Sequence, residues 1–203
     1  MPLPAKKTVP ESFELLRSRL HNPEFLAGHG LGNEVPFFVL PYDGAQETEV
    51  RAQLARLLAD TEAEAAKGGA RVFHADLWET FLAICESKRI SPEKMAALEE
   101  RRGSDALLSR MQTIATPEAF VAQMHEAFME KLGEPEPGRD ALIISGVGKV
   151  YPIVRAHSIL ENAQPVFIDM PVVLLYPGSY DGQQLHLFGT INDGNYYRAF
   201  NLL

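Results

Sequence analysis

Residues 142–152 read LIISGVGKVYP, an apolar run that ends in two glycines and a lysine. A Walker A loop for nucleotide phosphates has a glycine five positions before its Gly-Lys pair and a Ser or Thr after it, because that hydroxyl binds Mg²⁺. With Gly148 and Lys149 as the pair, those positions hold Ile143 and Val150. The stretch is therefore a degenerate P-loop-like strand-turn-helix without a Walker A motif.

The same turn also falls short of a dinucleotide-binding fingerprint. That motif needs a third glycine three positions after Gly148, where a tyrosine stands. What remains is a flexible turn before a helix, which we expect over about residues 151–163 with Pro152 in its first turn. Either Gly146, Gly148 and Lys149 form a weak anion site at the helix N-terminus, or the segment is a plain strand-to-helix turn.

Apolar runs on either side place this turn in a parallel sheet. ALIIS (141–145) and PVVLLY (171–176) flank the expected helix, which gives a strand-helix-strand unit of the right length for a right-handed parallel crossover. VPFFVL (35–40) is an unbroken apolar run, as expected for a strand covered on both faces, and ARVFHA (70–75) is strand-like. These runs predict a single α/β domain over residues 1–203, with three layers and a mostly parallel central sheet.

Start signals mark several helices between these strands. Thr8 and Glu11 predict a capping box for a short amphipathic helix that ends near His21. Asp76 is an N-cap candidate, and two later segments carry proline just inside a helix start. Together these signals predict a helical insertion over about residues 76–132.

The C-terminal part predicts a β-hairpin at an edge of the sheet. LHLFGTI (185–191) and NYYRAF (195–200) flank the sequence NDGN, whose Asp-Gly pair tolerates the positive φ that hairpin turns need.

Aromatic side chains gather around these C-terminal turns. Tyrosine is favoured at protein interfaces because it buries a large area at little entropic cost, and Tyr180, Asp181, Tyr196 and Tyr197 are therefore our partner-binding candidates. The alternative is that the tyrosines are ordinary strand residues that pack across a sheet.

Polar residues follow the predicted parallel strands, and the carboxyl ends of such strands share one edge, where ligands usually bind. The loops there carry Asp43, His74, Asp76, residues 146–149, Tyr180 and Asp181. Acid-base pairs, a metal, or phosphates held by Lys149 and Arg155 would make the chain a nucleotide- or metal-binding enzyme or sensor. The structural alternative is that the aspartates form turns and an N-cap, while the lysine covers a helix end.

No complete catalytic or metal motif accompanies this edge. The six histidines show no pair at metal-ligand spacing on one helix, and Cys85 has no second cysteine. Cys85 shares an apolar helix face with Trp78 and Phe81, which favours core packing over nucleophilic chemistry. We therefore expect no catalytic residue, no metal and no cofactor.

Charge and composition exclude other classes. The 203 residues are 46% hydrophobic, with a net charge of −8 and a pI of about 5.3. This acidic balance argues against autonomous binding of nucleic acid or anionic membrane, which requires clustered Lys and Arg. The single cysteine, the absence of an apolar leader and the lack of a long apolar run predict a cytoplasmic protein.

Four longer stretches carry a resemblance to a known family. GLGNEVPFFVLPYD, ISGVGKVYPIVRAHSILEN, PVVLLYPGSYDGQQLHLFG and NDGNYYRAF stand in this order over roughly residues 30–200. They resemble BrxB, a small component of bacteriophage exclusion (BREX) systems. Residues 76–135 contribute little to this resemblance.

The resemblance implies membership of a multi-protein defence system that modifies host DNA and blocks phage replication. The other members include the alkaline-phosphatase-like PglZ, an adenine methyltransferase and the large ATPase BrxC. The family implies no catalytic positions. It favours a non-catalytic adaptor that binds other BREX proteins, either PglZ or another large member of the system, with BrxC and the methyltransferase as further candidates.

Overall fold

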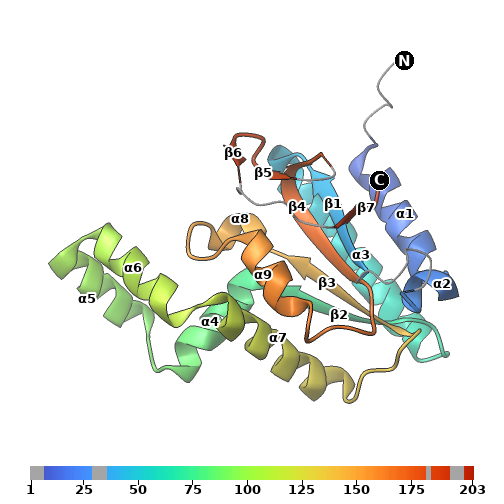
Figure 1. The fold of residues 1–203 in the computed structure, drawn as a ribbon, viewed down its shortest axis with the longest axis horizontal. Coiled ribbons are helices and arrows are strands. Elements are labelled where there is room, and N and C mark those ends of the chain that lie inside the picture. Colours follow the sequence, from blue (N-terminus) through green and yellow to red (C-terminus); the bar gives the residue numbers. More distant parts are fainter. Residues whose placement is uncertain (1–6, 29–35, 182–183, 193–198) are drawn as a thin grey trace.

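A mostly parallel sheet lies at the centre of the computed structural model, which describes residues 7–28, 36–181, 184–192 and 199–203 (Figure 1). Every pair of neighbours along its main path is parallel. The order along this path is β2 (Arg71–Asp76), β3 (Asp140–Ser145), β4 (Val172–Tyr180), β1 (Phe37–Tyr42) and β7 (Phe200–Asn201). The predicted parallel sheet is confirmed.

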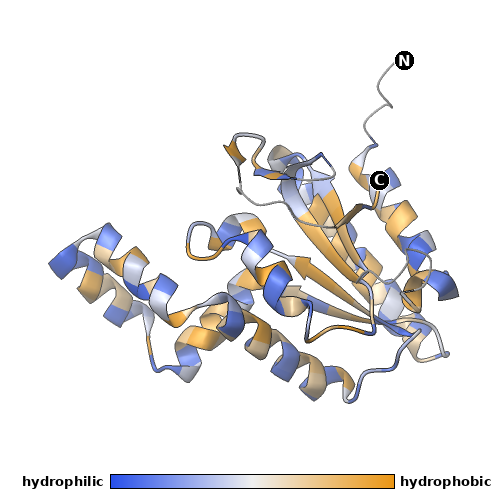
Figure 2. Ribbon diagram, in the orientation of Figure 1, coloured by the Kyte–Doolittle hydropathy of each residue, from blue (hydrophilic) through white to orange (hydrophobic). Residues whose placement is uncertain are grey.

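Helices cover both faces of this sheet, because its strands are apolar on both sides. All six residues of β3 are buried, and alternate residues belong to two separate hydrophobic clusters. One face carries α1 (Val9–Leu20), α2 (Pro23–Leu26) and α3 (Glu47–Ala65), and the other carries α4 (Leu77–Ser87), α7 (Pro117–Leu132), α8 (Val147–Val150) and α9 (Ala156–Ala163). Figure 2 shows the strands as the most hydrophobic part of the ribbon. The predicted three layers are confirmed.

The helical insertion lies between β2 and β3, as predicted, and consists of four helices. Its first and last members, α4 and α7, pack against the sheet. The other two, α5 (Pro92–Arg102) and α6 (Ser104–Ile114), pair with each other and extend away from the sheet as a helical hairpin (Figure 1). The predicted N-cap at Asp76 and the capping box of Thr8 and Glu11 are both confirmed.

The helix predicted over residues 151–163 is wrong at its start. A short helix, α8, follows the glycine turn directly and ends at Val150, and α9 begins only at Ala156. The residue before a proline is disfavoured in the helical region, and Tyr151 is accordingly extended, with φ −67° and ψ 135°. Pro152 therefore separates two helices instead of opening one.

The predicted C-terminal hairpin also pairs differently. The antiparallel pairing involves β5 (Leu185–Leu187), which joins β4, and β6 (Ile191–Asn192), which joins β5. Elsewhere, a 3₁₀ turn, η1 (Gly44–Gln46), follows β1. Phe200, the last residue of the run expected as the second hairpin strand, opens β7, which pairs in parallel with β1. Residues 193–198, which hold most of the expected turn and second strand, lie outside the described residues.

A buried ion pair joins the starts of β2 and β3. Nε and Nη2 of Arg71 each donate to one carboxylate oxygen of Asp140 at 2.6 Å, and Asp140 is fully buried. The same guanidinium donates to the carbonyl of Leu132 at 3.0 Å. The end of the helical insertion is thereby bound to the sheet.

Candidate functional site

At the carboxyl edge of the sheet, Asp76 and Lys149 bind each other. The Lys149 ammonium donates to the Asp76 carboxylate at 2.6 Å, and that carboxylate also accepts the Trp78 amide at 2.8 Å as the N-cap of α4. Burial by itself raises the pKa of the Asp76 carboxyl, but these hydrogen bonds outweigh burial, so its pKa lies below the ordinary value. Asp76 is thus an anion that holds α4 and α8 together.

His74 and Ser145 form a second pair, between neighbouring strands. Nε2 of His74 lies 2.7 Å from Oγ of Ser145. Burial lowers the pKa of the His74 imidazole, so the ring is neutral at pH 7. Both residues line a cavity of about 200 Å³ beneath α3. Tyr42 lines it too, and its hydroxyl donates to the Glu47 carboxylate.

The two glycines of the turn make room for side chains. Gly146 has φ 81°, and a Cβ there would lie 2.7 Å from an oxygen of Asp76. A Cβ on Gly148 would lie 2.9 Å from the ring of Phe188, which projects from the β5–β6 turn. Gly148 therefore faces an aromatic ring, and Lys149 faces a carboxylate. Whether the turn binds an anion stays a prediction.

Within the described residues, the remaining residues proposed from the sequence form no hydrogen bond to Asp76, Lys149 or His74. Asp43 caps η1 through the Ala45 amide at 3.0 Å, and Asp181 accepts the Gln184 amide at 2.7 Å in the turn after β4. Arg155 is exposed at the start of α9. Both aspartates occupy the turn positions of the structural alternative.

The partner-binding candidates divide into three cases. Tyr180 is 7% exposed, and its hydroxyl donates to the carbonyl of Ala199 at 2.7 Å, which favours a packing role. Asp181 is exposed. Tyr196 and Tyr197 lie outside the described residues, so their role stays a prediction.

The described part of the chain contains no group of three or more His, Cys, Asp or Glu residues placed to hold a metal ion. None of the helices there combines the length and apolar content that a bilayer crossing needs.

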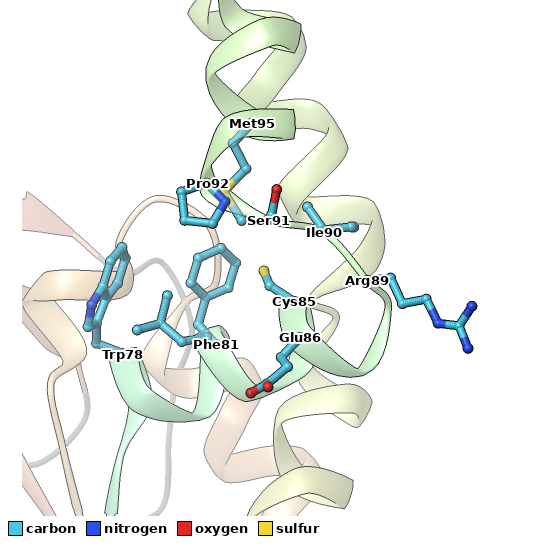
Figure 3. A pocket seen from close by; sticks show the side chains of 10 residues that line it. Trp78, Phe81, Cys85, Glu86, Arg89, Ile90, Ser91, Pro92 and Met95 are labelled. Carbon is cyan, nitrogen blue, oxygen red and sulfur yellow. The ribbon is translucent and has the colours of Figure 1, made fainter.

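An apolar groove lies on the helical insertion, at a helix face that the sequence predicted to be buried in the core. It occupies about 550 Å³ between α4 and the start of α5. Figure 3 shows Trp78, Phe81 and Cys85 along α4, with Pro92 and Met95 opposite. Phe81 and Cys85 are buried, as predicted for Cys85, but their neighbour Leu82 is 39% exposed. The sequence does carry a signal for this groove: the apolar residues of α4 extend over a wider part of the helix surface than one buried stripe would need.

Comparison with known proteins identifies the family. A family model described as "BREX protein BrxB" matches residues 73–202, which include the whole helical insertion and the glycine turn. The chain belongs to the BrxB family.

Two BrxB relatives cover nearly the whole chain. The BREX protein BrxB of Bacillus cereus (strain H3081.97) is 31% identical over 198 residues, which are 97% of this chain and 98% of the relative. The BREX protein BrxB of Escherichia coli O9:H4 (strain HS) is 26% identical over 191 residues, or 93% of this chain and 88% of the relative. No solved structure shows significant similarity to the chain.

Proposed function

We propose that this BrxB-family chain is a non-catalytic adaptor that binds other BREX proteins, PglZ first and BrxC or the methyltransferase in addition. The observation that carries the proposal is the α5–α6 hairpin. None of the residues of α5 is buried, although the structure describes all of them, so this helix adds little to the core. A helix that stands off the body in this way is well placed to contact another protein.

The carboxyl edge supports the non-catalytic part of the proposal. A phosphate or metal site there would need Lys149 as a free cation or Asp76 as a free ligand, and each is the partner of the other. The Asp76 carboxylate is also the N-cap of α4, so a ligand that drew on both of its oxygens would compete with that cap as well. These contacts favour a structural role for the edge.

The alternative is a nucleotide- or metal-binding enzyme or sensor at this edge. Thermal unfolding with and without Mg²⁺-ATP or Mg²⁺-GTP separates the two functions. A ligand at one hundred times its dissociation constant stabilises a protein by about 2.7 kcal/mol, whereas we expect no shift for an adaptor. A shift that Lys149→Ala removes would favour the alternative.

Co-purification tests the adaptor directly. The chain carries an affinity tag, is expressed with the complete BREX gene cluster, and is recovered at low and at physiological salt. We expect PglZ to be recovered in stoichiometric amount. Recovery of the chain alone under both conditions, or nucleotide turnover by the purified chain, would overturn the proposal.

A further inference from the structure

The groove between α4 and α5 is elongated along one helix. Phe81 and Leu82 stand three and four positions after Trp78, and Cys85 stands four and three positions after these two, so the four side chains share one side of α4. The rings of Trp78 and Phe81 lie 5.4 Å apart. Met95 of α5 forms the opposite wall (Figure 3). An apolar helix side of this kind matches the apolar stripe of a second helix laid alongside it.

Ser91, one of the polar residues that line the groove, is committed to the turn that builds it. Ser91 caps α5 by accepting the Lys94 amide at 3.4 Å, and the Lys94 ammonium donates to the carbonyl of Arg89 at 2.7 Å. Small-molecule sites use a few well-placed polar groups to fix the ligand's orientation. The two charged residues of the lining, Glu86 and Arg89, point away from the apolar floor and so do not converge on a small ligand there (Figure 3).

Two opposite charges stand at one end of the groove. Glu86 and Arg89 are exposed, and neither forms an ion pair within the part of the chain that the structure describes. Figure 3 shows both side chains pointing away from the apolar floor. Arg89 has φ 56°, a left-handed conformation that favours glycine at a helix end. The charged side chain therefore occupies a strained position at the border of the groove.

We propose that this groove binds one amphipathic helix of another BREX protein, an inference that rests on the adaptor function. Its apolar residues, spaced i, i+3 or i+4 and i+7, contact the side of α4 from Trp78 to Cys85. A basic residue faces Glu86 and an acidic residue faces Arg89. The apolar contacts supply the affinity, and the two charges fix the direction of the helix.

A second copy of the chain is the weaker occupant. Each copy carries a net charge of −8, so two copies repel each other.

Leu82→Glu tests the groove, and Ile168→Glu is its matched control. Both residues are exposed and aliphatic, at 39% and 59%, but Ile168 follows α9 and does not line the groove. Each variant is compared with the unchanged chain by co-purification with the complete gene cluster and by melting. We expect Leu82→Glu to weaken partner binding at least tenfold at unchanged melting temperature, and Ile168→Glu to bind normally.

The outcomes separate this inference from the adaptor function. If the unchanged chain recovers no BREX protein, the adaptor function fails and the groove inference with it. If the unchanged chain and Leu82→Glu recover PglZ equally, only the groove inference is overturned. If Leu82→Glu melts early, Glu86→Arg replaces it, because that change alters only an exposed charge. We then expect at least a threefold loss that grows at low salt, and equal binding would overturn the inference.

A photo-cross-linking amino acid at position 82 identifies the occupant. We expect a cross-link to one segment of a BREX protein with helical apolar spacing. A synthetic peptide of that segment, made without tryptophan, should shift the emission of Trp78, the only tryptophan of the chain. A cross-link to a second copy, a cross-link to an extended segment, or a bound small molecule in native mass spectrometry that Leu82→Glu removes would each overturn the proposal.

Discussion

The carboxyl edge of the sheet and the α4–α5 groove differ in their surface chemistry, although α4 borders both. At the edge, charged groups neutralise one another, as Asp76 and Lys149 do. In the groove, apolar side chains such as Leu82 stay uncovered and the charges beside them stay unpaired within the described residues. Satisfied polar groups indicate internal stability, whereas uncovered apolar groups indicate a surface for a partner.

The ion pair of Arg71 and Asp140, whose carboxylate is fully buried, should give the largest loss of stability when it is broken. Asp140→Ala removes this carboxylate but leaves Arg71, which is 13% exposed, paired with the half-exposed Glu136 at 2.8 Å, so we expect a loss of about 3 kcal/mol in the free energy of unfolding, the lower end for a broken buried pair. Urea unfolding measures it. A loss below about 1 kcal/mol would show that water replaces the carboxylate.

Asp76→Ala tests whether the carboxyl edge is structural. The change removes the N-cap of α4 and the partner of Lys149, and we expect a loss of about 2 kcal/mol. Lys149→Ala keeps the cap and should cost less than about 1 kcal/mol, because the lysine is one-third exposed. Loss of phage defence in Lys149→Ala, at normal protein level and melting temperature, would instead assign this lysine a direct role.

Gly148→Ala should destabilise through the ring of Phe188. The added Cβ lies 2.9 Å from that ring, which is half-exposed and able to move, so we expect a cost of about 1 kcal/mol. Phe188→Ala in the same chain should remove most of this cost. A double-mutant cycle by thermal unfolding measures the coupling, and purely additive effects would exclude the contact.

The pH dependence of stability should reflect His74. Its pKa in the folded chain lies below the ordinary 6.5, so the unfolded chain binds more protons in the interval between the two values. Stability from this group is complete above pH 6.5 and falls as the pH drops through that interval. His74→Gln should flatten this part of the curve, measured by urea unfolding at a series of pH values, and an unchanged slope would assign the dependence to other groups.

Leu82→Glu should give the smallest change in stability, in contrast to Asp76→Ala at the start of the same helix. Leu82 is partly solvated already, and we expect a change within about 0.5 kcal/mol. A larger loss in thermal unfolding would mean that the groove is a poorly covered part of the core.

Local signals predicted the fold well, whereas contacts between distant segments escaped them. Caps at Thr8 and Asp76 depend on residues two or three positions away, so the sequence displays them directly. The pair of Arg71 and Asp140 spans 69 residues, and only the parallel register of β2 and β3 brings them together. The pairing of β7 with β1 was missed for the same reason.

The sequence predicted where the candidate site lies but not which of its side chains bind each other. The order of strands and loops correctly placed Asp76 and Lys149 at one edge, yet it did not show that they would bind each other. The apolar stripe of α4 was interpreted as core, which is correct for Cys85 and incomplete for Leu82. Exposure of Leu82 depends on where α5 turns away, and no local pattern determines that direction.

The strand order has a consequence for synthesis of the chain on the ribosome. Among the described residues, β1 pairs only with β4 and β7, which begin at Val172 and Phe200. The apolar segment of β1 is translated early and must wait for the last sixth of the chain before it gains a neighbour. Until then it is an unpaired, hydrophobic strand edge of the kind that chaperones bind and that aggregates at high expression. A nascent chain that stalls before β4 therefore exposes a segment prone to misassembly.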